Sequence, residues 1–522
     1  MMKKCSRRRL QQSTPSVLVA GLLAACPLPA VDVADAGVGV DAGPEDPFAP
    51  APGDWPMFKR EPHHNGNALD LVGEITAANV CERWTRQVSG ANRGSSGPVI
   101  VRIGGVPRVV LAAQGSCVDG TCTGDAPGTM WMLDGSTGAI ALQTRLPADA
   151  QADPYGPVAL DVDGDGAREL VVPSLDDNRL FLFRLEDEPD GVAGSLQWTF
   201  TYDADGRSET GPVAVNLDDD PALEIVFGTD FDPNPGIFFV VDGATGEEQA
   251  RLAVRRRSTV SAACDTEPGS GNSKADSASP AAALIDGEMR VFGGAWDGRL
   301  YSLALRQGEL VAADVDELPL DGPEPCPVRK VRNGPVIAPL GPGGDLVVAF
   351  GHMAELDGDA QFESARLRVV NAGDLSLIGE LDQDIWKSSL SVGPLLQPGN
   401  QDQVLVAGRY RGAFAARVDG GAVVEQWSAD IGDGTPFGSN RSSPAVGDLD
   451  GDGDVEVVVG VEGNDGSGLL ILQGATGEEF LRREGADVAG APALGDVDGD
   501  GRLEIVYFDT AGFVHVLDSS CP

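Results

Sequence analysis

Residues 156–172 have the sequence GPVALDVDGDGARELVV, in which two short apolar runs flank a dense group of acids. The first apolar run leads directly into Asp161, Asp163 and Asp165, and the second follows Glu169. Short apolar runs joined by a glycine-containing turn are typical of neighbouring antiparallel β-strands. Carboxylates this close together repel one another, so the turn predicts a neutralising partner.

The pattern recurs along the chain, which makes it part of the architecture. It returns as GPVAVNLDDDPALEIVF from Gly211, SPAVGDLDGDGDVEVVV from Ser443 and APALGDVDGDGRLEIVY from Ala491. A shorter signal, a small residue followed by proline and an apolar run, occurs eight times at spacings of 48 to 68 residues. Its prolines are Pro98, Pro157, Pro212, Pro280, Pro335, Pro394, Pro444 and Pro492. Repeats of about fifty residues are a sequence signature of propeller blades.

One unit contains four predicted strands, at 158–160, 169–173, 179–184 and 196–202. The sequence therefore predicts an all-β fold, an eight-bladed β-propeller of four-stranded antiparallel blades, with seven blades as the alternative. The final unit lacks its fourth strand, and the segment CERWTRQV from Cys81 resembles the fourth strands of other units. We therefore expect the N-terminal strand to complete the last blade and remove a free sheet edge.

Six cysteines remain when Cys5 and Cys26 are set aside, an even number that suits disulfides in an exported protein. In an antiparallel pair the end of the third strand lies beside the start of the fourth. We therefore expect Cys81 to be bonded to Cys521. The other predicted bridges are Cys117–Cys122, which would staple one loop, and Cys264–Cys326, which pair by elimination.

The N-terminus resembles a bacterial lipoprotein signal peptide. Basic residues precede the apolar run SVLVAGLLAA, which is too short to span a bilayer and ends in the lipobox-like segment LAAC. The resemblance implies removal of residues 1–25 and lipidation of Cys26. Residues 26–53 are then expected to be a disordered acidic tether, and residues 54–522 the propeller. No aspartate follows Cys26 directly, which favours the bacterial outer membrane, with the protein facing the periplasm or the surface.

The formal net charge of −42 constrains the partners. It argues against nucleic acid and against anionic membrane surfaces, so membrane contact is expected through the lipid anchor alone. It fits an acidic exterior that holds divalent cations, and we expect a monomer.

The acidic loops have the ligand spacing of a calcium site. Oxygen ligands at positions one, three, five and nine can turn toward one centre, and the backbone carbonyl at position seven can join them. Hard oxygen ligands in a flexible loop favour Ca²⁺ over Zn²⁺ or Cu²⁺. The predicted ligands are Asp161, Asp163, Asp165, Ala167 and Glu169; Asn216, Asp218, Asp220, Ala222 and Glu224; Asp448, Asp450, Asp452, Asp454 and Glu456; and Asp496, Asp498, Asp500, Arg502 and Glu504. Because Pro221 replaces the glycine in the second loop, three or four structural calcium ions are expected. A solvated acidic turn without metal is the alternative.

These loops resemble the calcium loops of FG-GAP/VCBS repeats in integrin-like propellers, where DxDxDG lies between the two inner strands of a blade. A second set of motifs, DWPMF at 54–58, GAWDGRLYSL at 293–302 and turns such as VDGATG, is similar to quinoprotein-like (PQQ-type) propeller repeats. That resemblance implies aromatic residues between blades, at Trp84, Trp198 and Trp427. It extends to non-enzymatic outer-membrane assembly lipoproteins and to quinone-dependent dehydrogenases. Such dehydrogenases carry adjacent cysteines over the cofactor, and no two cysteines are adjacent here, so no organic cofactor is expected.

The long connections predict a binding face. Insertions at 114–128, 229–236, 255–279, 313–333, 351–365 and 430–442 all fall on the rim opposite the acidic loops. Candidate contacts there are Tyr155, Arg255, Arg256, Arg257, Phe437 and Arg441. We expect a calcium-stabilised, lipid-anchored binding, scaffolding or adhesion module for protein or glycan at the cell envelope, and not an enzyme. The alternative is an enzyme, either a propeller-type polysaccharide lyase or a quinoprotein-like enzyme. In the lyase, residues 255–257 or Lys330 would face an acidic sugar.

Overall fold

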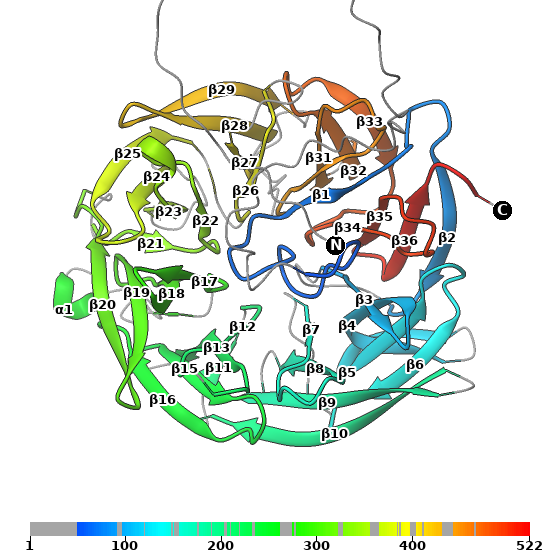
Figure 1. The fold of residues 1–522 in the computed structure, drawn as a ribbon, viewed down its shortest axis with the longest axis horizontal. Helices are drawn as coiled ribbons and strands as arrows, with labels where there is room; N and C mark the ends of the chain where they lie inside the picture. Colours follow the sequence, from blue (N-terminus) through cyan, green and yellow to red (C-terminus); the bar gives the residue numbers. More distant parts are fainter. Residues whose placement is uncertain are drawn as a thin grey trace, which may run out of the picture. The chain divides into compact units, whose positions relative to one another are not determined.

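The computed structural model describes residues 50–521, except for 91–96, 119–120, 148–149, 151–155, 175–176, 189–190, 203–205, 209, 219, 232–234, 262–273, 276–277, 322–326, 355–364, 384, 386–387, 397–402, 410–411, 431–441 and 464–465. Eight of its sheets are arranged as the blades of a β-propeller, so the eight-bladed prediction is confirmed over the seven-bladed alternative (Figure 1). Within the described residues, helix is limited to the four-residue α1 (Arg257–Val260) and a 3₁₀ turn, Pro342–Gly344.

Each blade is built from four antiparallel strands that follow one another from the centre of the ring outward (Figure 1). Blades one and two contain β3 (Val99–Ile103), β4 (Val106–Val118), β5 (Thr121–Asp134) and β6 (Ile140–Arg145), then β7 (Val158–Leu160), β8 (Arg168–Pro173), β9 (Arg179–Glu188) and β10 (Gly191–Thr201). Blades three and four contain β12 (Val213–Val215), β13 (Glu224–Gly228), β15 (Ile237–Asp242) and β16 (Glu248–Ala253), then β17 (Ala281–Ile285), β18 (Glu288–Gly294), β19 (Arg299–Arg306) and β20 (Glu309–Glu317).

Blades five and six contain β22 (Val336–Ala338), β23 (Val347–Met353), β24 (Arg366–Asn371) and β25 (Leu377–Asp382), then β26 (Ser391–Gly393), β27 (Val404–Arg409), β28 (Gly412–Asp419) and β29 (Ala422–Asp430). Blades seven and eight contain β30 (Ala445–Asp448), β31 (Glu456–Val461), β32 (Gly468–Gln473) and β33 (Glu479–Glu484), then β34 (Ala493–Gly495), β35 (Glu504–Phe508), β36 (Phe513–Asp518) and β2 (Cys81–Gln87). The short β21 (Lys330–Val331) also pairs with β23, and β11 (Gly206–Arg207) pairs with β14 (Asp230–Phe231).

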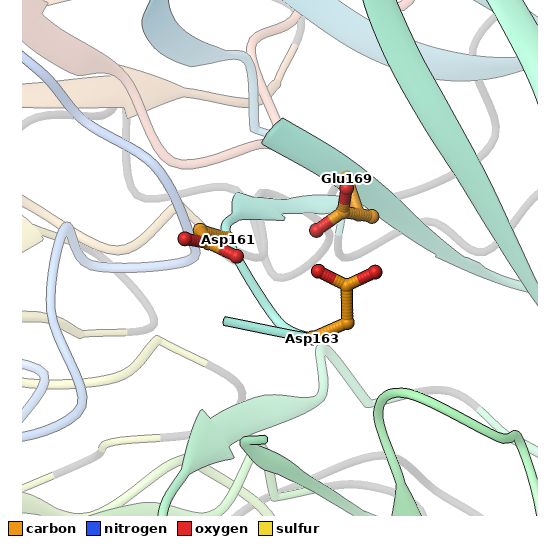
Figure 2. A group of neighbouring side chains, drawn as sticks. All are labelled: Asp161, Asp163 and Glu169. Atoms are coloured by element: carbon orange, nitrogen blue, oxygen red, sulfur yellow. The ribbon is translucent and has the colours of Figure 1, made fainter. Parts of the chain in front are cut away.

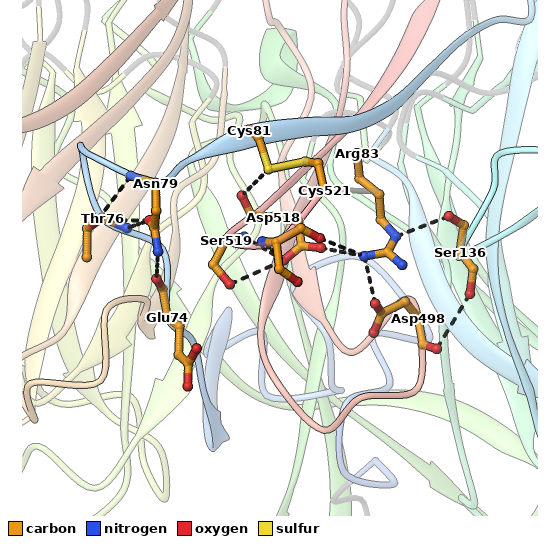
Figure 3. The surroundings of a disulfide bond; sticks show 11 residues. Glu74, Thr76, Asn79, Cys81, Arg83, Ser136, Asp498, Asp518, Ser519 and Cys521 are labelled. Carbon is orange, nitrogen blue, oxygen red and sulfur yellow. Dashed lines mark hydrogen bonds and ion pairs between the residues drawn. A yellow bond between two sulfur atoms is a disulfide. The ribbon is translucent and has the colours of Figure 1, made fainter.

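The ring closes by pairing the first part of the chain with the last. Strand β2 runs antiparallel to β36 and is the outermost strand of blade eight, which is the closure predicted from the sequence. A disulfide joins Cys81 to Cys521, 440 residues further along the chain, and this pairing follows from the predicted strand order (Figure 3). Arg83 adds ion pairs to Asp498, at 2.7 Å, and to Asp518.

The hydrophobic core lies between adjacent blades. The aromatic rings of Phe200 and Tyr202, from blade two, pack against Phe227 and Phe239 of blade three, with centroids 5.5–6.3 Å apart. Centroid separations of this size are typical of favourable aromatic pairs. Each blade therefore depends on its neighbours for the burial of its faces.

Three outer-strand tryptophans join one blade to the next. The indole N–H of Trp84 donates to the carbonyl of Gly135 at 2.6 Å, and Trp198 and Trp427 make the equivalent bonds in later blades. Each ring also covers a glycine of the neighbouring blade's outer turn, at Gly138, Gly246 and Gly477. A Cβ atom at any of the three would lie 2.5–2.6 Å from the ring, and all three have positive φ. The recurrent STG and ATG turns are therefore docking sites for these tryptophans.

The N-terminal segment occupies the centre of the ring, which the sequence analysis does not predict. Residues 53–66 form the blue trace in the middle of Figure 1, and β1 (Asn67–Val72) then pairs in parallel with β30 on the inner edge of blade seven. Carbonyls of this central segment accept backbone N–H groups from seven blades at 2.8–3.2 Å. The donors are Asp496, Ile100, Ala159, Ala282, Ile337, Val392 and Val446, and the acceptors are Gly53, Trp55, Pro56, Pro62, His63, Asn65 and Gly66.

Some predicted loops are strands. Strand β4 continues to Val118 and strand β5 begins at Thr121, so 114–128 is an extended hairpin rather than a loop insertion. The pairing is irregular between Gln114 and Ser116 and resumes beyond it, where Ser116 lies opposite Thr123. Cys117 lies directly opposite Cys122 in this register, and their bridge stays a prediction. Cys26, Cys264 and Cys326 lie outside the described residues.

Candidate metal centre

The four acidic loops connect the innermost strand of a blade to its second strand, in blades two, three, seven and eight. Innermost strands have both faces covered by neighbouring blades and end where the chain reaches the surface. Because these loops occupy the same place in each blade, they lie on one face of the ring. Figure 2 shows the first of them, with Asp161, Asp163 and Glu169 turned toward a common point.

The first loop is folded by its own side chains. The carboxylate of Asp161 accepts the backbone N–H groups of Gly164 and Gly166, at 2.8 and 2.9 Å. Both glycines have positive φ, which a side chain would resist. Asp163 accepts the N–H of Asp165, and Asp165 that of the seventh residue. The same bonds recur in the third loop, around Asp448, and in the fourth, around Asp496.

The glutamate at position nine closes each loop from the core side. In the first loop, Glu169 is fully buried, and its Oε2 accepts the N–H of Val162 at 3.0 Å. Its Oε1 is buried with no hydrogen-bond partner among the described residues, and so is Oε1 of Glu504. Leaving a carboxylate oxygen buried and unpaired is costly, and a bound cation would satisfy it.

The electrostatics of the loops also favour a cation. Burial above all, together with the charges of the neighbouring aspartates, raises the pKa of Glu169 to about 7, of Glu456 to about 8 and of Glu504 to about 9. Glu224 behaves in the same way, with its pKa raised to about 7. Negative charge is therefore in excess at each site.

The carboxylate oxygens that converge come from three residues in each loop, all within 4.8 Å of one another. These groups are Asp161, Asp163 and Glu169; Asp218, Asp220 and Glu224; Asp448, Asp450 and Glu456; and Asp496, Asp498 and Asp500. An all-oxygen donor set suits Ca²⁺, so the residues present fit that ion. Of the predicted carboxylate ligands, Asp165, Asp452 and Glu504 are outside these groups, and Arg184 forms an ion pair with Asp165. The amide of the predicted ligand Asn216 donates to the carbonyl of Asp220.

The residues at position seven were expected to offer a carbonyl. Their backbone N–H groups donate to the carboxylates at position five, which fixes the turn. These residues are Ala167, Ala222, Asp454 and Arg502.

The loops differ in how far the protein itself neutralises them. In the fourth loop Arg102 binds Asp496 at 2.8 Å. In the second loop the side-chain amide of Gln249 donates to Asp218 at 3.2 Å and to Glu224 at 3.4 Å, so a neutral donor faces these carboxylates. Across the described residues, no arginine or lysine forms an ion pair with the acids of the third loop. The third loop therefore has the strongest demand for an external cation.

The predicted binding face is described only in part. Arg255 is partly exposed and its backbone N–H donates to Asp297 at 2.9 Å, Arg256 is exposed, and Arg257 is buried in α1. Tyr155, Phe437 and Arg441 lie outside the described residues. Sequence reasoning missed Lys59 in the central segment and Trp296 between β18 and β19, which the GAWDG motif marked only as part of a repeat. Among the described residues, we find no helix with the length and apolarity needed to cross a membrane.

Comparison with known proteins identifies the fold. No protein-family model and no curated protein sequence matches the chain. Among solved structures, the quinohemoprotein alcohol dehydrogenase from Comamonas testosteroni is 13% identical over 91% of this chain and 82% of that chain, with a TM-score of 0.60. BamB from Moraxella catarrhalis is 12% identical over 84% of this chain and 99% of that chain, with a TM-score of 0.36. Rhamnogalacturonan lyase PL11 from Bacillus licheniformis is 14% identical, covering 83% and 91%, with a TM-score of 0.39. The likeness to the dehydrogenase shows the β-propeller fold, and it shows the fold alone.

Proposed function

We propose that this protein is a calcium-stabilised β-propeller of the bacterial cell envelope that binds protein or glycan as a scaffolding or adhesion module. In this proposal residues 1–25 are a signal peptide and Cys26 carries the lipid. The residues between Cys26 and the central segment then tether the propeller to the outer membrane. The acidic loops serve as FG-GAP/VCBS-type calcium loops, and their ions are structural.

The observation that carries the calcium proposal is the buried carboxylate oxygen with no partner. Oε1 of Glu169 has no hydrogen-bond partner among the described residues, and the Glu169 carboxylate converges with those of Asp161 and Asp163. Oε1 of Glu504 also has no such partner, and the charges of Asp498 and Asp500 raise the pKa of Glu504. In extracellular modules, calcium affinities of about 10⁻⁴–10⁻³ M are typical, so such loops would fill outside the cell.

Native mass spectrometry of the intact protein tests this proposal directly. With calcium present we expect three or four bound ions, which a chelator removes together with part of the thermal stability. Magnesium at the same concentration is the control, because it demands a smaller octahedral site and gives up its waters reluctantly. A mass that does not change with calcium would refute the structural role of the loops.

The position of the central segment supports a binding surface on a face of the ring. Residues 53–66 occupy the middle of the ring and are held there by backbone bonds to seven blades. We therefore infer that partners bind on the rim opposite the acidic loops, where the long connections are. Glycan-array screening and pull-down from envelope extracts test this inference. Binding that persists when residues 255–279 are replaced by a short linker would contradict it.

A polysaccharide lyase is the second candidate function. It is favoured by Lys330, which is 3% exposed and lies close to Arg257 and Arg332, a setting in which a lysine can serve as a base beside an acidic sugar. Incubation with uronic-acid polysaccharides would then release unsaturated sugars. A quinone-dependent dehydrogenase is less well supported, because the chain has no adjacent cysteines.

A further inference from the structure

Three basic side chains lie over one tryptophan on the rim opposite the acidic loops, and a fourth lies near one of the three. Trp296 lies in the turn between β18 and β19 of blade four. Its ring centroid is 4.3 Å from Nζ of Lys330, 4.7 Å from Cζ of Arg332 and 5.0 Å from Nζ of Lys274. Arg257 is close enough to Lys330 to depress the pKa of that lysine. We call these five residues the Trp296 cluster.

Backbone hydrogen bonds fix the Trp296 cluster in place. Trp296 donates its N–H to the carbonyl of Lys274 at 2.9 Å, and Val331 donates to the carbonyl of Ala295 at 3.1 Å. Lys330 itself lies in β21, opposite Met353 of β23. The connections that enter and leave blade four are therefore fastened to the turn that carries the indole, so the cations are held by the fold.

The cluster concentrates positive charge in a protein that is otherwise acidic. Lys330 is 3% exposed and Arg257 is 4% exposed. Burial above all, together with the charges of Arg257, Arg332 and Lys274, lowers the pKa of Lys330 to about 6. Lys274 also forms an ion pair with Asp230 at 2.6 Å. The indole face attracts cations, which offsets part of their mutual repulsion.

An unused donor lies at the same place. Nε1 of Trp296 is buried and has no hydrogen-bond partner among the described residues. Trp296, Lys274 and Arg332 are each partly exposed, so the cluster reaches the surface. An oxygen of an anionic group placed there would accept from the indole N–H and lie beside the cations.

We propose that the Trp296 cluster binds the carboxylate of a uronic-acid oligosaccharide. This inference rests on the proposed function, in which this rim binds a glycan or a protein. The formal charge of −42 repels densely charged polymers such as nucleic acids, so single carboxylates spaced along a sugar chain fit better.

Isothermal titration with tetragalacturonate, compared with its fully methyl-esterified form, tests the proposal. We expect the acid to bind on the order of tenfold or more tightly than the ester, because the ester cannot make charge-assisted bonds. Lys330→Gln and Arg332→Gln should each weaken acid binding by about the same factor. Arg306→Gln is the matched control, because Arg306 lies at the opposite end of β19, is exposed, and pairs with Glu288 at 2.6 Å.

A second readout separates binding from folding. A bound carboxylate favours the charged form of Lys330, which raises its pKa and draws a proton from solution near pH 7. The binding heat should therefore depend on the ionisation enthalpy of the buffer for the wild-type protein, and not for Lys330→Gln. Trp296→Phe should keep the fold and weaken binding, because it removes the indole N–H.

Three outcomes would overturn the inference. The first is equal affinity for acid and ester. The second is binding of inorganic sulfate at the cluster without binding of the oligosaccharide, which would mark an adventitious ion only. The third is unchanged affinity in Lys330→Gln and Arg332→Gln. If one of these outcomes occurs but the variants still bind another glycan on an array, the proposed function stands and this inference alone fails. If the protein binds no glycan and no protein at all, both fail.

Discussion

Replacing Lys59 by methionine should stabilise the protein near neutral pH, and the gain should shrink as the pH rises. Lys59 is fully buried in the central segment, and its Nζ donates to the carbonyl of Pro444 at 2.5 Å and to the hydroxyl of Ser391. Burial lowers the pKa of Lys59 well below its usual value. Methionine has a similar length and no charge to desolvate. Ser391 also donates to the Pro444 carbonyl, so that acceptor keeps a partner.

The sign and the magnitude follow from proton linkage. In the unfolded chain a lysine stays protonated up to about pH 10.4, whereas in the folded protein the lowered pKa leaves it neutral. Between the two pKa values the unfolded state binds the extra proton, so the wild type gains about 1.4 kcal/mol of stability per pH unit from this group. Methionine has no such dependence. As the pH rises from the lowered pKa toward about 10.4, the advantage of Lys59→Met should therefore fall by about 1.4 kcal/mol per pH unit.

Equilibrium unfolding in urea, followed by tryptophan fluorescence with calcium held in constant excess, measures this difference. Lys330→Met is a parallel check, because the pKa of Lys330 is lowered to about 6 and the same slope should apply. Other titrating groups, the loop glutamates among them, cancel in the comparison with the wild type at each pH. A difference between the wild type and Lys59→Met that does not change with pH would show that Lys59 is charged in the folded protein, and the reasoning would be wrong.

Three further predictions concern the loops, the closure and the contacts between blades. Asp448→Asn should remove one calcium ion from the native mass spectrum, whereas Asp218→Asn in the second loop, where Gln249 contacts the acids, should remove none. When the calcium concentration is 100-fold above the dissociation constant, the loss of one site should lower the apparent stability by about 2.7 kcal/mol. The double change Cys81→Ser with Cys521→Ser opens a loop of 440 residues and should lower the unfolding free energy by about 2–5 kcal/mol. Denaturant midpoints should show a larger loss than for the double change Cys117→Ser with Cys122→Ser. Gly477→Ala should lower the unfolding free energy by about 2–5 kcal/mol, since its Cβ would lie 2.5 Å from the ring of Trp427. The control Gly421→Ala, also at positive φ but with nothing within 4 Å, should lower it by about 1–2 kcal/mol. Equal losses would mean that the tryptophan contact is unimportant.

The repeats made the architecture predictable from sequence. The proline signals set the blade count, and the missing fourth strand of the last unit placed Cys81 beside Cys521. Strand lengths were less predictable, because β4 and β5 extend through polar residues that carry no apolar alternation. The central segment was missed for a related reason. Residues 53–66 bind the blades through backbone carbonyls, which residues with any side chain can offer. The amino acids of this segment therefore carry no periodic pattern.

The sites show the same division between local and distant information. The bonds that fold the first loop all lie within nine residues, so the DxDxDG spacing was enough to predict the convergence of Asp161, Asp163 and Glu169. Gln249 reaches the second loop from β16, 25 residues beyond Glu224, and no motif announces it. The Trp296 cluster draws on three separate connections, so only the fold could bring its members together.

The central segment also determines how force on the N-terminal side of the chain would reach the ring. In chain order, the segment after residue 52 contacts blade eight through Gly53, runs around the centre past six other blades, adds β1 to blade seven, and returns to blade eight as β2. A pull on the N-terminus would therefore load many short backbone bonds at the centre before it reached the β2–β36 pairing, which the disulfide secures in turn. If the residues between Cys26 and the central segment tether the protein as we propose, force from a bound partner passes through the axis of the ring, and no single blade edge has to bear it. This arrangement accounts for a costly buried lysine in the central segment: Lys59 connects that segment to Ser391 of blade six and to the Pro444 carbonyl just before blade seven, which holds the segment in register with the ring.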